Sequence, residues 1–229
     1  MSATIIPQLV RKDFMISRTM IGVFALVSLV CAGVVGLLFG RLPGWALVNL
    51  GLILLLSPAA TCGIVLLMQT IVFEKEKSTQ AFIMSLPVSA KQFALAKLLI
   101  NLPVFAAFWL VITGIAFHFA FGRDFFPAGM IPFFVMVFLG AFVAYAGILS
   151  VSLWRQSLGL TVLAIALFEM GTSAYLWVVA YLDPVAKFMH GPEVVWNRAA
   201  IGIVAIQALA AVAMLSAALF HQSRKRDFV

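Results

Sequence analysis

The sequence predicts an all-α integral membrane protein, and its composition and long apolar runs are the two observations behind that prediction. Hydrophobic residues make up 64% of the chain and charged residues 10%, whereas soluble proteins hold roughly 45–50% and 25%. A water-soluble core does not need so many apolar residues, so we expect lipid to surround most of the chain. A membrane-spanning helix needs about 20 apolar residues. Six runs reach that length, at 16–39, 45–72, 97–121, 130–153, 157–182 and 199–220.

These six runs occupy most of the 229 residues and leave no room for a separate soluble domain. We therefore expect 1–229 to form a single transmembrane domain. The second run is longer than a bilayer requires, which predicts a helix that tilts or that continues past the lipid. Pro58 within that run predicts a kink.

The positions of the basic residues predict the orientation in the membrane. If the N-terminus is cytoplasmic, eleven of the 15 lysines and arginines fall on the cytoplasmic side and four on the other side. Cytoplasmic loops show this bias, so both termini and the segment 74–97 are expected to be cytoplasmic. The net charge of +7 then reflects attraction to the anionic inner leaflet. Nucleic acid is not expected as a partner, because the chain offers no basic patch on a folded soluble surface.

Residues 1–15 are expected to form an interfacial helix ahead of the first span. Ile6, Leu9, Val10 and Phe14 can share one helical face, opposite a polar and basic face. A helix of this pattern lies in the headgroup plane of the bilayer. A frayed basic tail is an equal alternative for the first few residues.

The longest polar interruption of the chain lies between the second and third runs, at 73–99, and holds six of the 23 charged residues (15 basic and 8 acidic). We expect two short helices joined by a turn, lying on one face of the membrane. Pro87 disfavours helical angles in the residue before it, so the first helix is expected to end by about Leu86. A structured connector without a partner is the alternative interpretation. The six charged residues are Glu74, Lys75, Glu76, Lys77, Lys91 and Lys97.

The second of these short helices carries a complete start signal. Ser89 is a favourable N-cap residue. Gln92, three positions later, can accept a hydrogen bond from the backbone N–H of Ser89 and close a capping box. Val88 and Phe93 supply the matching hydrophobic staple. These agreeing signals predict a rigid elbow over 74–97 instead of a slack loop.

The longest loop on the outer side is 183–198. Its aromatic and apolar residues could let it dip back as a short amphipathic, re-entrant segment over the outer mouth. A plain connector is the simpler expectation.

Glu169 is the single acid inside a predicted span, near the middle of the fifth one. A charge at that depth costs at least roughly 2.5–3.5 kcal/mol, so the side chain must face protein or water, or carry a proton. By depth, Tyr145 in the fourth span and Gln207 in the sixth are candidate hydrogen-bond partners. Two interpretations stay open. Glu169 lines or gates a central cavity with these residues, or it is protonated and pins two helices together.

Sequence motifs for enzymatic chemistry are missing from the chain. There is no GxxxxGK[ST] phosphate-binding loop, and neither HExxH nor GxSxG occurs. The three histidines lie far apart, and the two cysteines, in the first two spans, have no metal-ligand set beside them. We therefore expect no enzymatic activity, no cofactor and no metal in this chain.

An E-x-E pair and an L-P-V-S stretch stand between the second and third spans, and four more spans and a basic tail follow. This order of parts, after a cytoplasmic amphipathic start, resembles that of the permease subunits of type-2 ABC exporters. The resemblance covers essentially the whole chain. One departure is the basic pair Lys75 and Lys77 beside the glutamates, which bears on the partner surface. The residues that carry the resemblance are Glu74, Glu76, Leu86-Pro87-Val88-Ser89, Lys91, Lys97, Phe220 and Arg226-Asp227-Phe228.

The resemblance implies a homodimer, or a heterodimer with a close homologue, in a bacterial cytoplasmic (inner) membrane, with two separate ABC ATPase subunits docked below. ATP and Mg would be bound by those ATPase subunits. The first elbow helix, 74–86, would be the coupling helix seated in a groove of the ATPase, with the N-terminal helix as a second contact. Such families move lipids, glycans, peptides or drugs, and the short outer loops favour a hydrophobic or amphipathic cargo. The implied coupling residues are Glu74, Lys75, Glu76, Lys77, Gln80, Phe82, Leu86 and Pro87.

Two other functions remain open at this point. A self-contained, proton-coupled secondary transporter or channel would use Glu169 and would transport with no ATPase present. It predicts paired inverted repeats with broken helices near the midplane. A non-transporting membrane scaffold predicts that cargo flux stays unchanged in a Glu169→Ala variant that still forms its complex.

Overall fold

The computed structural model describes residues 5–76 and 88–224, and within these ranges the chain is built from helices and short turns. Six of its helices are long and apolar enough to cross a membrane. The predicted all-α fold with six membrane-length helices is therefore confirmed. The elements are α1 (Ile5–Leu38), α2 (Gly44–Leu67), the π-helical turn η2 (Met68–Val72), α3 (Phe73–Glu76), α5 (Ala90–Phe121), the short 3₁₀ helix η3 (Ala128–Met130), α6 (Ile131–Arg155), α7 (Leu158–Tyr181), α8 (Asp183–Met189) and α9 (Arg198–Arg224).

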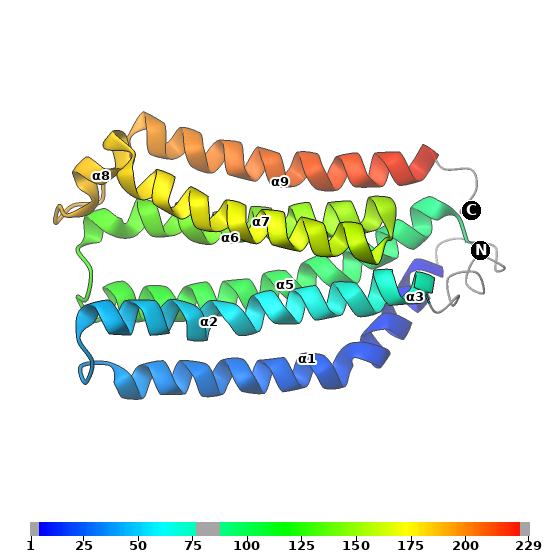
Figure 1. The fold of residues 1–229 in the computed structure, drawn as a ribbon, viewed down its shortest axis with the longest axis horizontal. Helices are drawn as coiled ribbons and strands as arrows, with labels where there is room; N and C mark the ends of the chain where they lie inside the picture. Colours follow the sequence, from blue (N-terminus) through cyan, green and yellow to red (C-terminus); the bar gives the residue numbers. More distant parts are fainter. Residues whose placement is uncertain (1–4, 77–87, 225–229) are drawn as a thin grey trace.

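The six long helices run along one axis in alternating directions (Figure 1). α1 begins and α9 ends at the same end of the bundle, where α3 also lies, and we call this the proximal end. α8 lies at the opposite end, which we call the distal end (Figure 1). The chain leaves α3 and enters α5 at the proximal end, so the predicted elbow belongs there.

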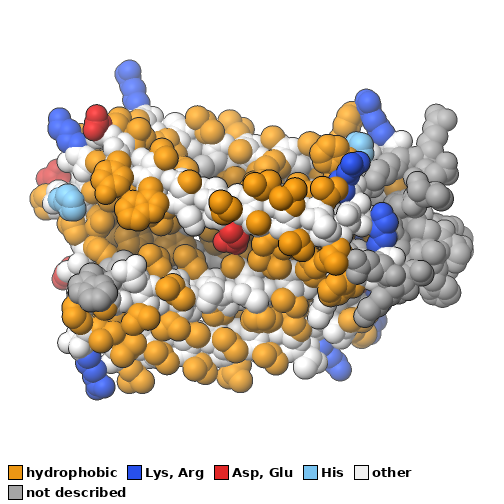
Figure 2. Space-filling model, viewed as in Figure 1, with side chains coloured by type: hydrophobic (Ala, Val, Ile, Leu, Met, Phe, Trp, Pro, Cys, Tyr) orange, Lys and Arg blue, Asp and Glu red, His pale blue; other side chains and the backbone are white. Residues whose placement is uncertain are grey.

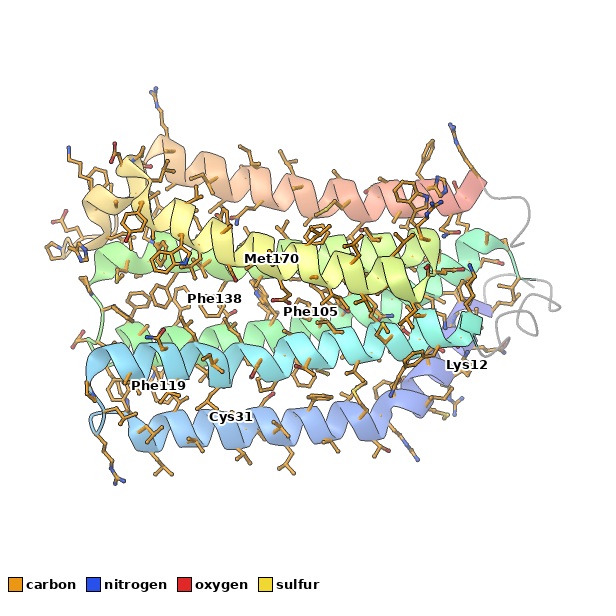
Figure 3. The ribbon with its side chains drawn as sticks, in the orientation of Figure 1. Lys12, Cys31, Phe105, Phe119, Phe138 and Met170 are labelled. Atoms are coloured by element: carbon orange, nitrogen blue, oxygen red, sulfur yellow. The ribbon has the colours of Figure 1, made fainter. Side chains whose placement is uncertain are left out.

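The helices form two groups, α1–α2–α5 and α6–α7–α9, which meet mainly where α5 packs on α6 and α9. Leu149 of α6 is fully buried against Leu67 and Ile71 at the end of α2. Aromatic side chains also stand between the two groups, as Phe105 and Phe138 do in Figure 3. The close packing of the two groups thus places the core along α6.

Apolar side chains cover the middle of the outer surface, and Lys and Arg side chains stand at the two ends (Figure 2). Large hydrophobic residues on three of the helices point outward: Leu26 is 63% exposed, Met170 71% and Leu209 68%. Water solvates a continuous apolar surface of this kind poorly, whereas hydrocarbon chains solvate it well. The surface is that of a multi-pass membrane protein.

Two predicted pairs of helices are in fact two continuous helices. The interfacial helix expected at 1–15 and the span at 16–39 belong, over the described residues, to one helix, α1, which changes direction near its N-terminal end (Figure 1). The second elbow helix and the third span are likewise joined in α5, which continues through Pro103. No glycine or proline stands at either expected boundary, so the backbone has no local reason to leave the helix there.

The loop 183–198 contains a short helix, α8, packed on the distal end, where a plain connector was the simpler expectation. Val185 and Met189 are buried against α6, α7 and α9. The backbone N–H of Gly129 donates to the carbonyl of Gly191 at 3.0 Å. A Cβ on Gly129 would lie 2.2 Å from the Phe188 carbonyl oxygen, so only glycine fits this contact. The loop therefore closes the distal end of the α6–α7–α9 group.

Candidate coupling site and midspan groove

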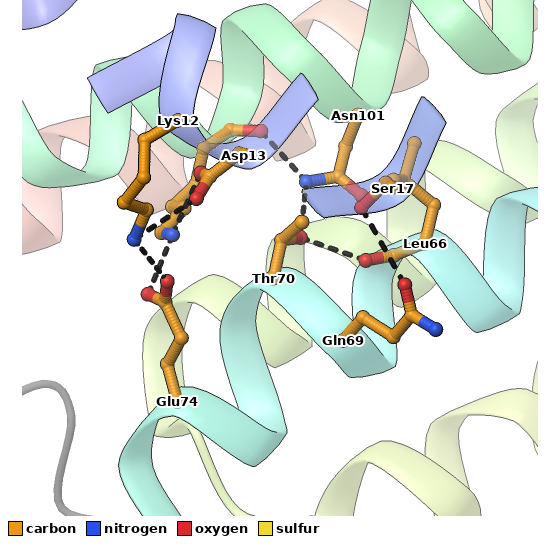
Figure 4. A network of polar contacts seen from close by, with 9 residues as sticks. Lys12, Asp13, Ser17, Leu66, Gln69, Thr70, Glu74 and Asn101 are labelled. Carbon is orange, nitrogen blue, oxygen red and sulfur yellow. Dashed lines mark hydrogen bonds and ion pairs between the residues drawn. The ribbon is translucent and has the colours of Figure 1, made fainter. Parts of the chain in front are cut away.

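Four charged side chains meet at the proximal end, and we call them the charge cluster: Lys12 and Asp13 of α1, Glu74 of α3 and Lys97 of α5 (Figure 4). Asp13 and Lys97 are each 1% exposed and Glu74 is 9% exposed. The side chain of Lys12 is 34% exposed. The cluster holds two cations and two anions, so it is neutral as a unit.

Each anion of the charge cluster contacts both cations. Nζ of Lys97 lies 2.8 Å from Oδ2 of Asp13 and 2.5 Å from Oε2 of Glu74. Nζ of Lys12 lies 2.5 Å from Oε1 of Glu74 and 3.1 Å from Oδ1 of Asp13. Removing an ion from water costs several kcal/mol, which only close pairing offsets. Separating these side chains is therefore unfavourable, and the cluster fixes α1, α3 and α5 relative to one another.

Neutral polar groups extend the charge cluster towards the middle of the bundle. Nδ2 of Asn101 donates to the Thr70 hydroxyl at 2.9 Å and to the Lys97 carbonyl at 2.8 Å. The Thr70 hydroxyl donates to the carbonyl of Leu66 at 2.8 Å. The hydroxyl of Tyr145 in turn donates to the Asn101 carbonyl at 3.3 Å. Thr70 lies in the π-helical turn η2, a type of helix defect that is frequent at functional sites.

The start of α5 is fixed to α1 as well. The predicted capping box is present: the Ser89 hydroxyl accepts from the Gln92 backbone N–H at 3.3 Å, and Oε1 of Gln92 accepts from the Ser89 N–H at 2.9 Å. Phe93 is 1% exposed and packs with Leu9, and Val88 lies against the same cluster. The apolar face predicted at the start of α1 thus holds the start of α5.

The predicted coupling residues fall into three sets. Glu74 lies inside the charge cluster, with its carboxylate turned to Lys12 and Lys97. Lys75 is exposed, and Glu76 is the last residue of α3. The remaining members, Lys77, Gln80, Phe82, Leu86 and Pro87, lie outside the described residues.

Residues of α2, α5, α6 and α7 line a groove halfway along the bundle. In the view of Figure 1, α2 and α7 lie in front of α5 and α6. We call this space the midspan groove. It holds about 660 Å³ of empty space, part of it open to the surroundings. Its walls are mainly aliphatic and aromatic. It is lined by Leu56, Ala59, Ala60, Ile64, Phe105, Trp109, Ile112, Ala141, Ala144, Tyr145, Ile148, Glu169 and Thr172.

Glu169 stands in the middle of α7 on the rim of this groove and is exposed. At 1.5 Å per residue it is about 17 Å from either end of the helix. The other hydrogen-bonding side chains of the groove, on Trp109, Tyr145 and Thr172, each donate to a backbone carbonyl. The side chain of Glu169 makes no hydrogen bond or ion pair with another residue of 5–76 or 88–224. Figure 2 shows an acidic side chain in the middle of this otherwise apolar face.

The structure places one of the two candidate partners of Glu169 beside it. Tyr145 lines the same groove, although its hydroxyl donates elsewhere. Gln207 lies where α6, α7 and α9 meet, and its Nε2 donates to the Met136 carbonyl at 2.8 Å and to the Tyr175 hydroxyl at 2.9 Å. Gln207 therefore joins three helices and takes no part in the midspan groove.

An apolar pocket lies next to the midspan groove towards the distal end, and Leu56 lines both. This second space holds about 550 Å³ of empty space, part of it open to the surroundings, and has six phenylalanines in its wall. We call it the phenylalanine pocket. Its aromatic residues are Phe39, Phe119, Phe125, Phe126, Phe134 and Phe138.

Sequence analysis did not identify the pairing of Asp13 with Lys97. The signal was present, because each charge adjoins a long apolar run: Asp13 precedes 16–39, and Lys97 opens 97–121. Opposite charges beside apolar helices need partners. Pairing them required knowing that α1 and α5 are neighbours, which no local pattern gives.

No protein-family model, curated protein or solved structure matches this chain. In the described part of the chain, no three His, Cys, Asp or Glu side chains are grouped so that they could hold a metal ion.

Proposed function

We propose that this chain is the membrane-spanning permease subunit of an ATP-driven ABC exporter, which works as a dimer with separate ATPase subunits. The sequence resemblance is one support. The observation that carries the proposal is that the residues flanking 77–87 are attached on both sides to α1: Glu74 pairs with Lys12, and Phe93 packs on Leu9. The proximal end is then the cytoplasmic end, and 77–87 belongs to the coupling segment.

A displacement of this coupling segment would be transmitted to three spans at once. The Glu74–Lys12 pair links it to α1, the Lys97–Asp13 pair links α1 to α5, and α3 continues from α2 through η2. Well-packed interiors are poorly compressible and transmit strain. Closure of the ATPase pair would therefore shift α1, α2 and α5 against α6, α7 and α9. The midspan groove lies between those two groups and would change its shape.

The contact with the ATPase is assigned to Lys75 and to the predicted coupling residues that follow it in the sequence. Glu74 is committed to the charge cluster, so its replacement would disturb the fold as well as the contact. Lys75 is exposed and lies outside the charge cluster, so its replacement should change the contact with the ATPase without disturbing the fold. The coupling surface proposed here comprises Lys75, Glu76, Lys77, Gln80, Phe82, Leu86 and Pro87.

The test begins with the gene next to the one for this chain, which is expected to encode an ABC ATPase. The two proteins are produced together, and the complex is isolated by a tag on this chain. Lys75→Glu is expected to lower the recovery of the ATPase several-fold. Lys187→Glu is the matched control, because it reverses the same charge at an exposed site on the distal end, and it should leave recovery unchanged.

Three results would contradict the proposal. The first is equal recovery of the ATPase with both variants, which would contradict the assignment of the coupling surface. The second is failure of the two wild-type proteins to form a complex. The third is transport by the purified chain alone, driven by a proton gradient. That outcome would favour the secondary transporter, for which the unpaired Glu169 is the supporting observation.

A further inference from the structure

We propose that the midspan groove binds a hydrophobic cation, an amine or onium group on an apolar body, with the Glu169 carboxylate as its counter-ion. The cargo role of this ligand rests on the exporter proposed above. The binding site itself rests only on the geometry of the groove.

The carboxylate of Glu169 is the feature that calls for a ligand. A charge at this depth is expensive, and acids inside spans normally pair with another group or face a watery cavity. The donor hydrogens of the groove's other polar side chains are already used, because its hydroxyl and indole groups donate to backbone carbonyls. A cation that enters the groove would supply the missing partner of Glu169.

This chain cannot supply that cation, either from its own spans or from a second copy. Its lysines, arginines and histidines stand in loops or towards the ends of the spans, and the basic side chains in Figure 2 lie at the two ends of the bundle. Glu169 is about 17 Å from both ends of α7. A second copy laid against the groove would bring no basic side chain to this depth, which leaves the carboxylate without a counter-ion.

The walls of the groove suit a cation with an apolar body. Phe105, Trp109 and Tyr145 line it together with Glu169, and aromatic faces attract cations as well as hydrocarbon. The phenylalanine pocket adjoins the groove towards the distal end, with Leu56 in the wall of both. The apolar body of a cation held at Glu169 would therefore lie against the groove walls, next to that pocket. An anion of the same shape would meet the same walls but would be repelled by the carboxylate.

The test uses two probes of the same shape and opposite charge. Tetraphenylphosphonium and tetraphenylborate are titrated against the purified full chain in nanodiscs of uncharged phosphatidylcholine. Empty nanodiscs give the background for each probe. Saturable binding of tetraphenylphosphonium in excess of that background is expected, with no corresponding binding of tetraphenylborate.

Three variants test whether Glu169 is the residue that binds the cation. Glu169→Gln should weaken tetraphenylphosphonium binding roughly tenfold or more, because the ion pair is lost. Glu169→Asp keeps the charge and should keep most of the affinity. Glu193→Gln is the matched control, since it removes the charge of an exposed acid in the distal loop, and it should bind as the wild type does. Helicity and elution volume are expected to be unchanged in all three.

Equal binding by the Glu169→Gln variant and the wild type overturns the inference, as does saturable binding of both probes alike. A Thr172→Cys variant tests whether a second copy of the chain covers the groove. Efficient cross-linking of two chains through this cysteine would place a second copy over the groove and would also overturn it. The binding test needs no ATPase. Failure to form an ATPase complex would therefore contradict the proposed exporter function but would not affect the binding result.

Discussion

Asp13 and Lys97 are almost completely buried, although each is a charged residue beside a long apolar run. Their burial is tolerable because Lys97 contacts two carboxylates and Asp13 contacts two ammonium groups. A buried pair adds little stability compared with apolar residues of the same size, but the loss of one partner is strongly unfavourable. The charge cluster is therefore expected to specify which helices meet.

That asymmetry gives a prediction for single and paired replacements. Asp13→Leu or Lys97→Met alone should lower the free energy of unfolding by about 3 kcal/mol, because each leaves a buried charge with too few partners. The double variant should lose less than either single variant, since Lys12 and Glu74 still balance each other. Unfolding by sodium dodecyl sulfate in mixed micelles, followed by far-UV circular dichroism, measures these differences.

Lys12→Met serves as the control for this series. The Lys12 side chain is 34% exposed, so solvent can replace part of its interaction with the two carboxylates, and its loss should cost less than the loss of Lys97. If the losses of the two single variants simply add in the double variant, the charges of Asp13 and Lys97 do not stabilise each other.

At the scale of the element, the start of α5 depends on a cap that can be tested alone. Ser89→Ala removes the side-chain oxygen that accepts from the Gln92 N–H and should lower the free energy of unfolding by about 1 kcal/mol. Ser89→Asp keeps an acceptor and should unfold as the wild type does. The same mixed-micelle titration measures both. A loss of equal size in the two variants would show that the cap contributes nothing.

The elements were predictable to different degrees from the sequence. The six spans follow from run length and hydrophobicity, and the beginning of α5 follows from Ser89 and Gln92, because these signals are local. The continuity of α1 and of α5 was missed, since polar residues at 1–15 and 89–97 suggested separate interfacial helices. In the structure those residues pack against each other, as Leu9 and Phe93 do, and tertiary contacts extend the helices.

For the whole molecule, the orientation in the membrane gives the next prediction. Lys75 marks the proximal end, and Arg41 and Lys187 mark the distal end; all three are exposed. In a background with Cys31→Ala and Cys62→Ala, a cysteine at Arg41 or Lys187 should react with a membrane-impermeant maleimide on intact cells. A cysteine at Lys75 should react only after the cells are opened, because the proximal end is expected to be cytoplasmic. The reverse pattern would contradict the proposed coupling to a cytoplasmic ATPase.

The candidate site was predictable only in its separate parts. Glu169 was identified because a lone acid in a span is unusual, and Glu74 because it lies in the polar elbow. Their surroundings depend on which helices are neighbours. Gln207 and Tyr145 have the right depth to reach Glu169, but the packing turns Gln207 towards Tyr175 and gives Tyr145 a carbonyl of α5. The depth of a residue along a span can be counted from the sequence. The neighbour that its side chain faces is known only once the packing of the helices is known.

The neutrality of the charge cluster has a consequence for a protein in an energised membrane. A potential of 100 mV does about 2.3 kcal/mol of work on one elementary charge that crosses the whole bilayer. Two cations and two anions that move together experience almost no net electrical force. The charge cluster can therefore shift as a unit almost without regard to voltage, and within the cluster only a rearrangement that parted Lys97 from its carboxylates would sense the field.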